Sequence, residues 1–141
     1  MPDIKIFTLD EAERSLPLVR RILADLQAEY GTWREAVATF EAASAGPHSE
    51  SEGSDELEAL RSRVTAAALR INGYLEELEA IGCIFKGFEE GLVDFYALKE
   101  DRLVFLCWKL GEDHITHWHE VDTGFAGRQP IEAGAFSGII P

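Results

Sequence analysis

The sequence has few cysteines and no long apolar run. Its 141 residues include only Cys83 and Cys107, and no apolar stretch approaches the ~20 residues that a membrane-spanning helix needs. The first residues do not form the basic and apolar leader of a secreted protein. We therefore expect a cytoplasmic protein with two free thiols, although the sequence alone leaves a disulfide open.

Basic residues are also scarce. Lysine and arginine together number 13 against 26 acidic residues, which gives a formal net charge of −13. Phosphate backbones and anionic lipid headgroups repel such a chain, because binding to them depends on basic side chains. The charge balance argues against nucleic-acid and membrane partners. We interpret it as favouring solubility rather than an acidic docking face.

The sequence does contain two matched helical patterns in one domain-sized chain. The first, over residues 8–43, begins with Thr8 and Glu11, whose side chains and backbone amides can form a reciprocal capping box. Pro17 predicts a kink or a restart after the second turn. Apolar residues then recur at alternating steps of three and four, which keeps one stripe of a helix against a partner. They are Leu16, Val19, Leu23, Leu26, Tyr30, Trp33, Val37 and Phe40.

The second pattern spans residues 56–82 and follows a polar loop over residues 44–55. Its apolar stripe has the same spacing and consists of Leu57, Leu60, Val64, Ala67, Ile71, Tyr74, Leu78 and Ile81. Gly82 supplies the residue type that commonly ends a helix. The two stripes match when the helices run antiparallel, with Phe40 opposite Leu57. A long antiparallel coiled-coil hairpin is therefore expected.

Strand-like patterns replace the helical ones after this hairpin. The segments 92–98, 103–110 and 114–121 are predicted as strands of an antiparallel meander within residues 84–122, and 84–88 is a candidate fourth strand. Residues 123–141 are expected to form a Gly-rich, loosely packed arm. The predicted fold class is α+β, a helical hairpin followed by a three- to four-stranded antiparallel sheet in a single domain.

Some apolar helix residues lie outside the matched stripes, among them Leu18, Ile22, Leu69 and Leu75. A two-helix hairpin buries only one seam, so these residues need cover from the sheet or from a second chain. We expect both kinds of cover, and therefore a homodimer.

Motifs at both ends of the chain stand out together. They are Phe7-Thr8-Leu9-Asp10-Glu11-Ala12, Leu16-Pro17-Leu18, Gly91-Leu92-Val93-Asp94-Phe95, Leu106-Cys107-Trp108-Lys109-Leu110-Gly111-Glu112, Trp118-His119-Glu120 and Gly124-Phe125-Ala126-Gly127-Arg128-Gln129-Pro130. Together they resemble a bacterial family known only as domain of unknown function 2203. The resemblance covers nearly the whole chain and implies a cytoplasmic protein built on a helical hairpin. It supplies no catalytic residues, because that family has no settled activity.

The third predicted strand carries a His-x-His pair. Side chains alternate along a strand, so His117 and His119 share one face. A two-residue turn before this strand would place Trp108 opposite His117 and Leu106 opposite His119. A short turn before the second strand would then place Asp94 opposite Leu106. This register, which is an assumption, brings Asp94 and His119 together on one face of the sheet.

Imidazole and carboxylate groups in this arrangement suit zinc or iron. The candidate metal ligands are Asp94, His117, His119 and Glu120, and Glu89 and Glu90 are further sources of an oxygen ligand. The alternative is a partly buried polar cluster that binds no metal, since an aspartate and a histidine can satisfy each other by a hydrogen bond.

The other polar and aromatic candidates are weaker. Cys107 is interpreted as a small buried hydrophobe, and we reject cysteine catalysis because nothing in the sequence lowers the pKa of either thiol. Trp108 and Trp118 are packing residues that the assumed register places on opposite faces. Gly127 and Arg128 form a candidate anion- or ligand-binding loop, but a structural turn in which Arg128 pairs with Asp122 or Glu120 is favoured.

Three functional hypotheses follow. The first is a self-associating binding module with a pocket between sheet and helices, for a small-molecule ligand that the sequence does not identify. The second is a metal-dependent enzyme that uses His117, His119 and Asp94 as zinc or iron ligands and Glu120 or Glu90 as a base. The third is a purely structural protein that assembles through its coiled coil. We favour the first, without catalysis.

Overall fold

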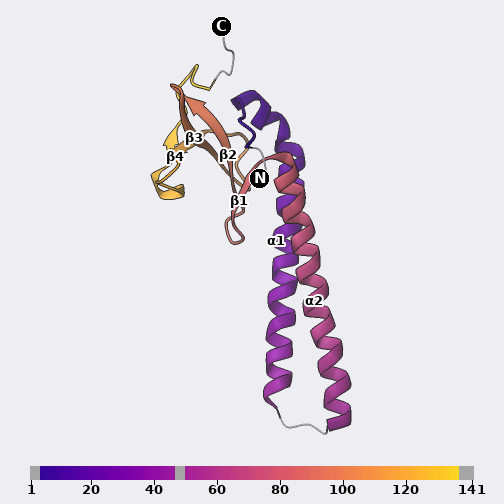
Figure 1. Ribbon diagram of the computed structural model, residues 1–141. Helices are drawn as coiled ribbons and strands as arrows, with labels where there is room; N and C mark the ends of the chain where they lie inside the picture. Colours follow the sequence, from indigo (N-terminus) through magenta and orange to yellow (C-terminus); the bar gives the residue numbers. More distant parts are fainter. Residues whose placement is uncertain (1–3, 47–49, 137–141) are drawn as a thin grey trace.

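The computed structural model describes residues 4–46 and 50–136. Helices α1 (Leu9–Ala45) and α2 (Glu50–Ile81) form an antiparallel hairpin that extends well beyond the sheet at one end (Figure 1). The sheet lies beside the other end of this hairpin, near the N-terminus of α1. The expected α+β class is confirmed. No helix in the described ranges combines the length and the apolar character that crossing a membrane requires.

The start of α1 follows its sequence signals. Thr8 accepts a hydrogen bond from the backbone of Glu11, and the carboxylate of Glu11 accepts one from the backbone of Thr8, so the capping box is confirmed. Pro17 lies inside a continuous helix rather than at a restart. The first turns of α1 bend away from its long straight part (Figure 1), as expected where proline removes a backbone donor.

The connection between the helices is shorter than predicted. Helix α1 continues to Ala45 and α2 begins at Glu50, so the loop expected over residues 44–55 was wrong at both ends. Turn-forming residue types at the ends of these helices misled the prediction, because packing against a partner helix can override local propensity. Gly82, with φ 109°, ends α2 as expected.

The apolar stripe of α1 reaches both α2 and the sheet. Its buried members pack in one cluster with side chains of α2 and of the strands. This cluster includes Leu16, Val19, Leu23 and Leu26 of α1, and Ile71 and Leu78 of α2. Farther along the hairpin, Arg70 of α2 donates two hydrogen bonds to Glu29 of α1, which agrees with the antiparallel alignment.

The sheet has five antiparallel strands, each paired with its neighbours in sequence. They are β1 (Ile84–Gly87), β2 (Leu92–Lys99), β3 (Arg102–Lys109), β4 (His117–Glu120) and β5 (Gln129–Pro130). The last strand and the buried Phe136 lie in the segment expected to be a loose arm, so this expectation was wrong up to residue 136. Residues 137–141 of that arm lie outside the described part of the chain.

The strand register differs by one residue from the assumed one in both central ladders. Asp94 pairs with Cys107 rather than Leu106, and Cys107, not Trp108, pairs with His117. His119 pairs with Phe105. The cause lies in the connections. Strands β2 and β3 are joined by a tight turn with both central residues at positive φ, and β4 starts only after a longer segment, residues 110–116.

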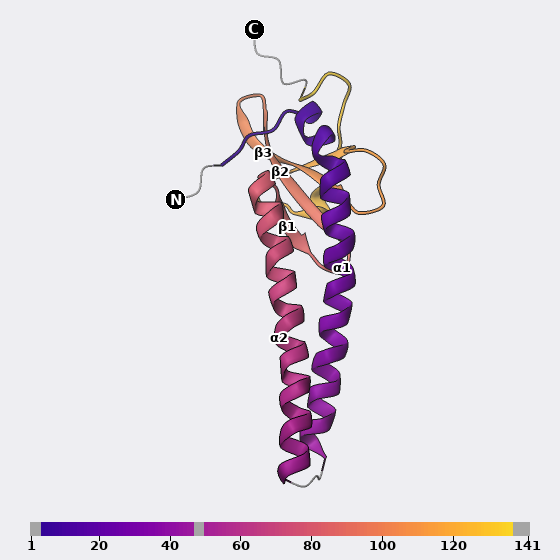
Figure 2. The ribbon, with the colours of Figure 1, turned by 90° about the vertical axis from the view of Figure 1, so that its right-hand side faces the viewer.

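This shift exchanges the two faces of β3. Trp108 and Trp118, expected on opposite faces, both pack in the core cluster with the helices. Asp94, Cys107 and His119 alternate with core residues along their strands and so lie on the outer face, whereas the helices lie along the opposite side of the sheet (Figure 1 and Figure 2). The expected pocket between sheet and helices is therefore wrong for these residues, because a one-residue slip turns every side chain over.

Candidate metal centre

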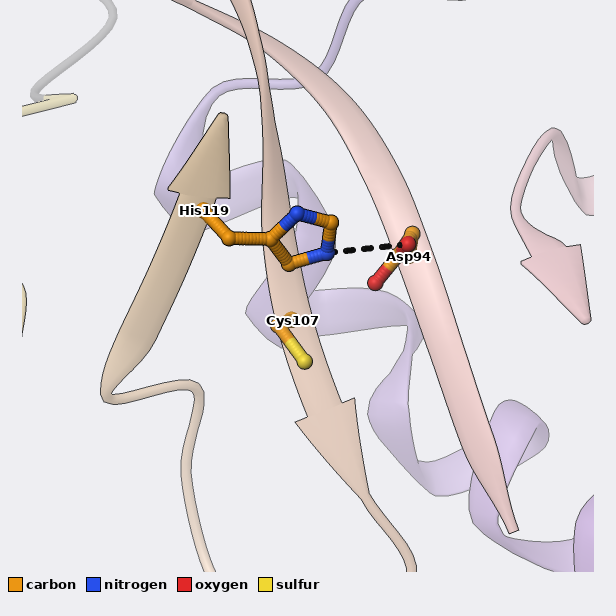
Figure 3. Close-up of side chains that lie close together, drawn as sticks. All are labelled: Asp94, Cys107 and His119. Atoms are coloured by element: carbon orange, nitrogen blue, oxygen red, sulfur yellow. Dashed lines mark hydrogen bonds and ion pairs between the residues drawn. The ribbon is translucent and has the colours of Figure 1, made fainter. Parts of the chain in front are cut away.

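Three polar side chains meet on the outer face of the sheet. Asp94 comes from β2, Cys107 from β3 and His119 from β4. Their side chains lie side by side, with the ring of His119 turned toward the carboxylate of Asp94, while α1 passes behind the strands (Figure 3). All three residues are buried. Within the described ranges they form the one group of three or more histidine, cysteine and acidic residues whose ligand atoms could hold a metal ion, with those atoms within 4.8 Å of one another.

The hydrogen bonds of His119 fix where its ring carries hydrogen. Its Nδ1 atom lies 2.7 Å from the carbonyl oxygen of Glu120, which can only accept, so Nδ1 is the donor. Its Nε2 atom lies 3.1 Å from Oδ2 of Asp94. Two bare acceptors repel each other, so the second contact needs either another hydrogen, on Nε2 or Oδ2, or a cation.

Burial raises the pKa of both the Asp94 carboxyl and the Cys107 thiol. The side chains of Asp94 and His119 are each 3% exposed. Desolvation raises the pKa of Asp94, although the positive charge of a protonated His119 and the hydrogen bond from it act in the opposite direction. Desolvation, and after it the nearby charge of Asp94, raise the pKa of Cys107 to about 12. Without a metal, Cys107 is a neutral thiol at physiological pH.

The geometry of the three donor atoms fits a tetrahedral zinc site. Two nitrogen or oxygen ligands of zinc lie roughly 3.3 Å apart, and a sulfur ligand lies roughly 3.6 Å from each of them. The 3.1 Å between Nε2 of His119 and Oδ2 of Asp94 is close to the first value. The sulfur of Cys107 lies within 4.8 Å of both of these atoms, a limit that is compatible with the second value.

Two of the predicted ligands lie outside this group. His117 is half-buried, and its Nδ1 atom lies 2.8 Å from the hydroxyl of Thr116. Glu120 accepts two hydrogen bonds from Arg102, at 3.0 and 2.6 Å, which lower the pKa of Glu120. Glu120 pairs with Val104, a core residue on the helix side of the sheet, so strand alternation sets it on the opposite face from His119. The further candidates, Glu89 and Glu90, lie in the turn before β2 and are exposed.

The glycine–arginine loop forms an outer wall. Arg128 does pair with a carboxylate, but with Glu112, at 2.9 and 3.1 Å, instead of Asp122 or Glu120. The backbone N–H of Gly127 donates to the carbonyl oxygen of Gly124. A Cβ atom at Gly127 would lie 2.5 Å from the Cβ of Thr123, so the absence of a side chain lets this loop close tightly.

Cys107 is the member of the cluster that sequence reasoning missed. It was interpreted as a hydrophobe because a free cysteine in the middle of a strand usually is one, and the assumed register did not place it opposite Asp94. A signal was present in the segment Lys99-Glu100-Asp101-Arg102. If only its two central residues form the turn, Lys99 pairs with Arg102, and counting back along both strands sets Cys107 opposite Asp94.

Comparison with known proteins agrees with the motifs that span the chain. A search of curated proteins and a search of solved structures each found no match. The family model described as "Uncharacterized conserved protein (DUF2203)" matches residues 5–131, which include both helices and all five strands. The chain therefore belongs to the DUF2203 family of uncharacterized conserved proteins.

Proposed function

We propose that this protein is a metal-binding module that holds one zinc ion through Asp94, Cys107 and His119. The observation that carries the proposal is the orientation of the His119 ring, which two contacts fix. Its Nδ1 hydrogen is held by a backbone carbonyl, so Nε2 is the ring nitrogen that faces the carboxylate of Asp94 and that can bind a metal. Metal-binding histidines characteristically have this second hydrogen bond, which fixes the ring and its tautomer.

Charge and ligand type favour zinc over iron. A thiolate is a soft ligand that zinc accepts readily together with imidazole and carboxylate. Zinc with one thiolate, one carboxylate and one neutral imidazole has no net charge. The metal-free site, with one hydrogen shared by Asp94 and His119 and one on Cys107, is also neutral. Neutrality in both states matters because a buried net charge is costly.

Three protein ligands leave one coordination position of zinc open. Structural zinc sites are closed by four protein ligands, whereas open sites bind water or a small molecule. The cluster adjoins a cavity of about 220 Å³. A metal-dependent enzyme is therefore the second candidate. In such an enzyme the open position lies at this cavity, and Glu120, which does not line it, is not the base.

Zinc titration of the tag-free, metal-free protein tests the proposal. We expect one zinc ion per chain and release of about two protons, one from Cys107 and one from the Asp94–His119 pair. Zinc affinity should therefore rise by about 100-fold per pH unit near neutral pH. Isothermal calorimetry in buffers of different ionisation enthalpy measures both quantities. Binding without proton release, or no saturable binding, would contradict the proposal.

We also propose that two chains pair through their helices. Leu18 of α1 and Leu69 of α2 are 51% and 64% exposed, although both belong to the hairpin. Burying them against a second chain removes apolar surface from water. Sedimentation equilibrium at micromolar concentration should find a dimer that Leu69→Glu dissociates. As a matched control, Leu98→Glu changes a leucine that is 49% exposed on the sheet and should leave the dimer intact. A wild-type monomer would contradict this prediction.

A further inference from the structure

The cavity beside the metal cluster has a defined size and lining. Its volume is about 220 Å³, which corresponds to about seven water molecules in the liquid, so it fits a small molecule rather than a cofactor. Besides the three cluster residues it is lined by Lys86, Leu92, Val121, Gly124 and Phe125. Phe125 is held in place by the guanidinium of Arg128, which lies 4.7 Å from its ring centroid.

Among the described residues, Lys86 is the one lysine or arginine that lines this cavity. Its ammonium nitrogen lies 5.4 Å from the ring centroid of Phe105, so it sits over the outer face of the sheet. Its charge reaches the cluster, where it lowers the pKa of Asp94 against the larger effect of burial. Arg128, the other nearby cation, is already held by Glu112.

The net charge of the zinc-bound site then indicates whether its ligand is positively or negatively charged. Zinc, the Cys107 thiolate and the Asp94 carboxylate sum to zero, and Lys86 adds one positive charge. A ligand with one negative charge restores neutrality, and Lys86, although its side chain is exposed, offers such an ion a charge-assisted contact. The remaining walls, Leu92, Val121 and Phe125, are apolar and suit a few carbon atoms.

We infer that the ligand of this site is a small monocarboxylate. Its carboxylate oxygen takes the open position of the zinc ion, Lys86 supplies the counter-charge, and its short apolar part lies against Leu92, Val121 and Phe125. This inference rests on the proposed zinc site and adds to it the class of the ligand and the residue that selects it.

The test uses the full chain loaded with cobalt(II), whose visible absorption responds to a change of its ligands, and acetate as the probe. We expect acetate to shift the spectrum saturably and Lys86→Met to weaken acetate binding about tenfold, because a charge-assisted contact is lost. The Lys86→Met chain should still take up one cobalt ion, because Lys86 is not a metal ligand. Lys86→Arg should restore most of the acetate affinity. The matched control is Lys99→Met, which removes a lysine near Trp118 on the other face and should bind acetate like the wild type.

The outcomes separate the two proposals. A chain that takes up no cobalt or zinc overturns the metal site and this inference with it. A chain that takes up metal but shows no spectral change with acetate overturns the inference alone. Equal acetate affinity in the wild type and Lys86→Met would also overturn the inference alone. Stronger binding of neutral acetamide than of acetate would have the same consequence.

Discussion

Replacing Cys107 by serine is expected to lower the zinc affinity by more than about 100-fold. Loss of residues that only orient a metal ligand already costs 10–100-fold, and this change removes the sulfur ligand itself. The serine hydroxyl is similar in size to the thiol but is a poor zinc ligand at neutral pH. Competition with a chromophoric chelator measures the affinity.

The matched control for this change is the second cysteine. Cys83 is buried, and burial raises its pKa to about 12, as for Cys107. It lies in the core between helices and sheet, on the other side from the cluster. Cys83→Ala should therefore bind zinc like the wild type. Equal losses in both variants would show that general damage to the fold, and not loss of a ligand, explains the effect.

Removing either partner of the Asp94–His119 pair should lower the free energy of unfolding of the metal-free protein by about 3 kcal/mol. Both side chains are 3% exposed, so either variant leaves a buried polar group without its partner. Replacing both residues by leucine should cost less than the sum of Asp94→Leu and His119→Leu, because no unpaired group then remains. Urea unfolding in the presence of a chelator measures all four chains.

Zinc distinguishes a metal site from a purely structural polar pair in the same experiment. At a free zinc concentration 1,000 times the dissociation constant, binding should add about 4 kcal/mol to the free energy of unfolding of the wild type. Neither single variant nor the double variant should gain this increment at the same zinc concentration. If zinc leaves the wild type unchanged while the coupling between Asp94 and His119 is large, the pair is a structural cluster without a metal.

The helical half of the fold could be predicted from sequence because its signals are local and periodic. The capping box at Thr8 and the helix end at Gly82 each depend on a few neighbouring residues. The apolar stripe of α1 required only the helical repeat. The loop was misjudged because Ser, Gly and Pro residues indicate a turn without fixing how many of them it contains.

The sheet was less predictable because its register depends on the exact lengths of its connections. An error of one residue in the turn before β3 placed Leu106 and Trp108 on the outer face, where the structure has Cys107. The same error in the next ladder kept Asp94 and His119 on a common face, so this pair was found. Cys107 was therefore not predicted as a ligand, whereas Glu120 was predicted as one although it lies on the other face. The pairing of Arg128 with Glu112 depends on tertiary packing that the local sequence does not encode.

X-ray absorption at the zinc edge of the zinc-loaded wild type identifies the atoms bound to the metal and so tests the proposed ligands themselves. We expect one sulfur neighbour at ~2.3 Å and nitrogen or oxygen neighbours at ~2.0–2.1 Å, including one imidazole. The sulfur contribution should disappear in Cys107→Ser. A first shell with no sulfur, or one that is identical in the wild type and Cys107→Ser, would contradict a zinc site built from Asp94, Cys107 and His119.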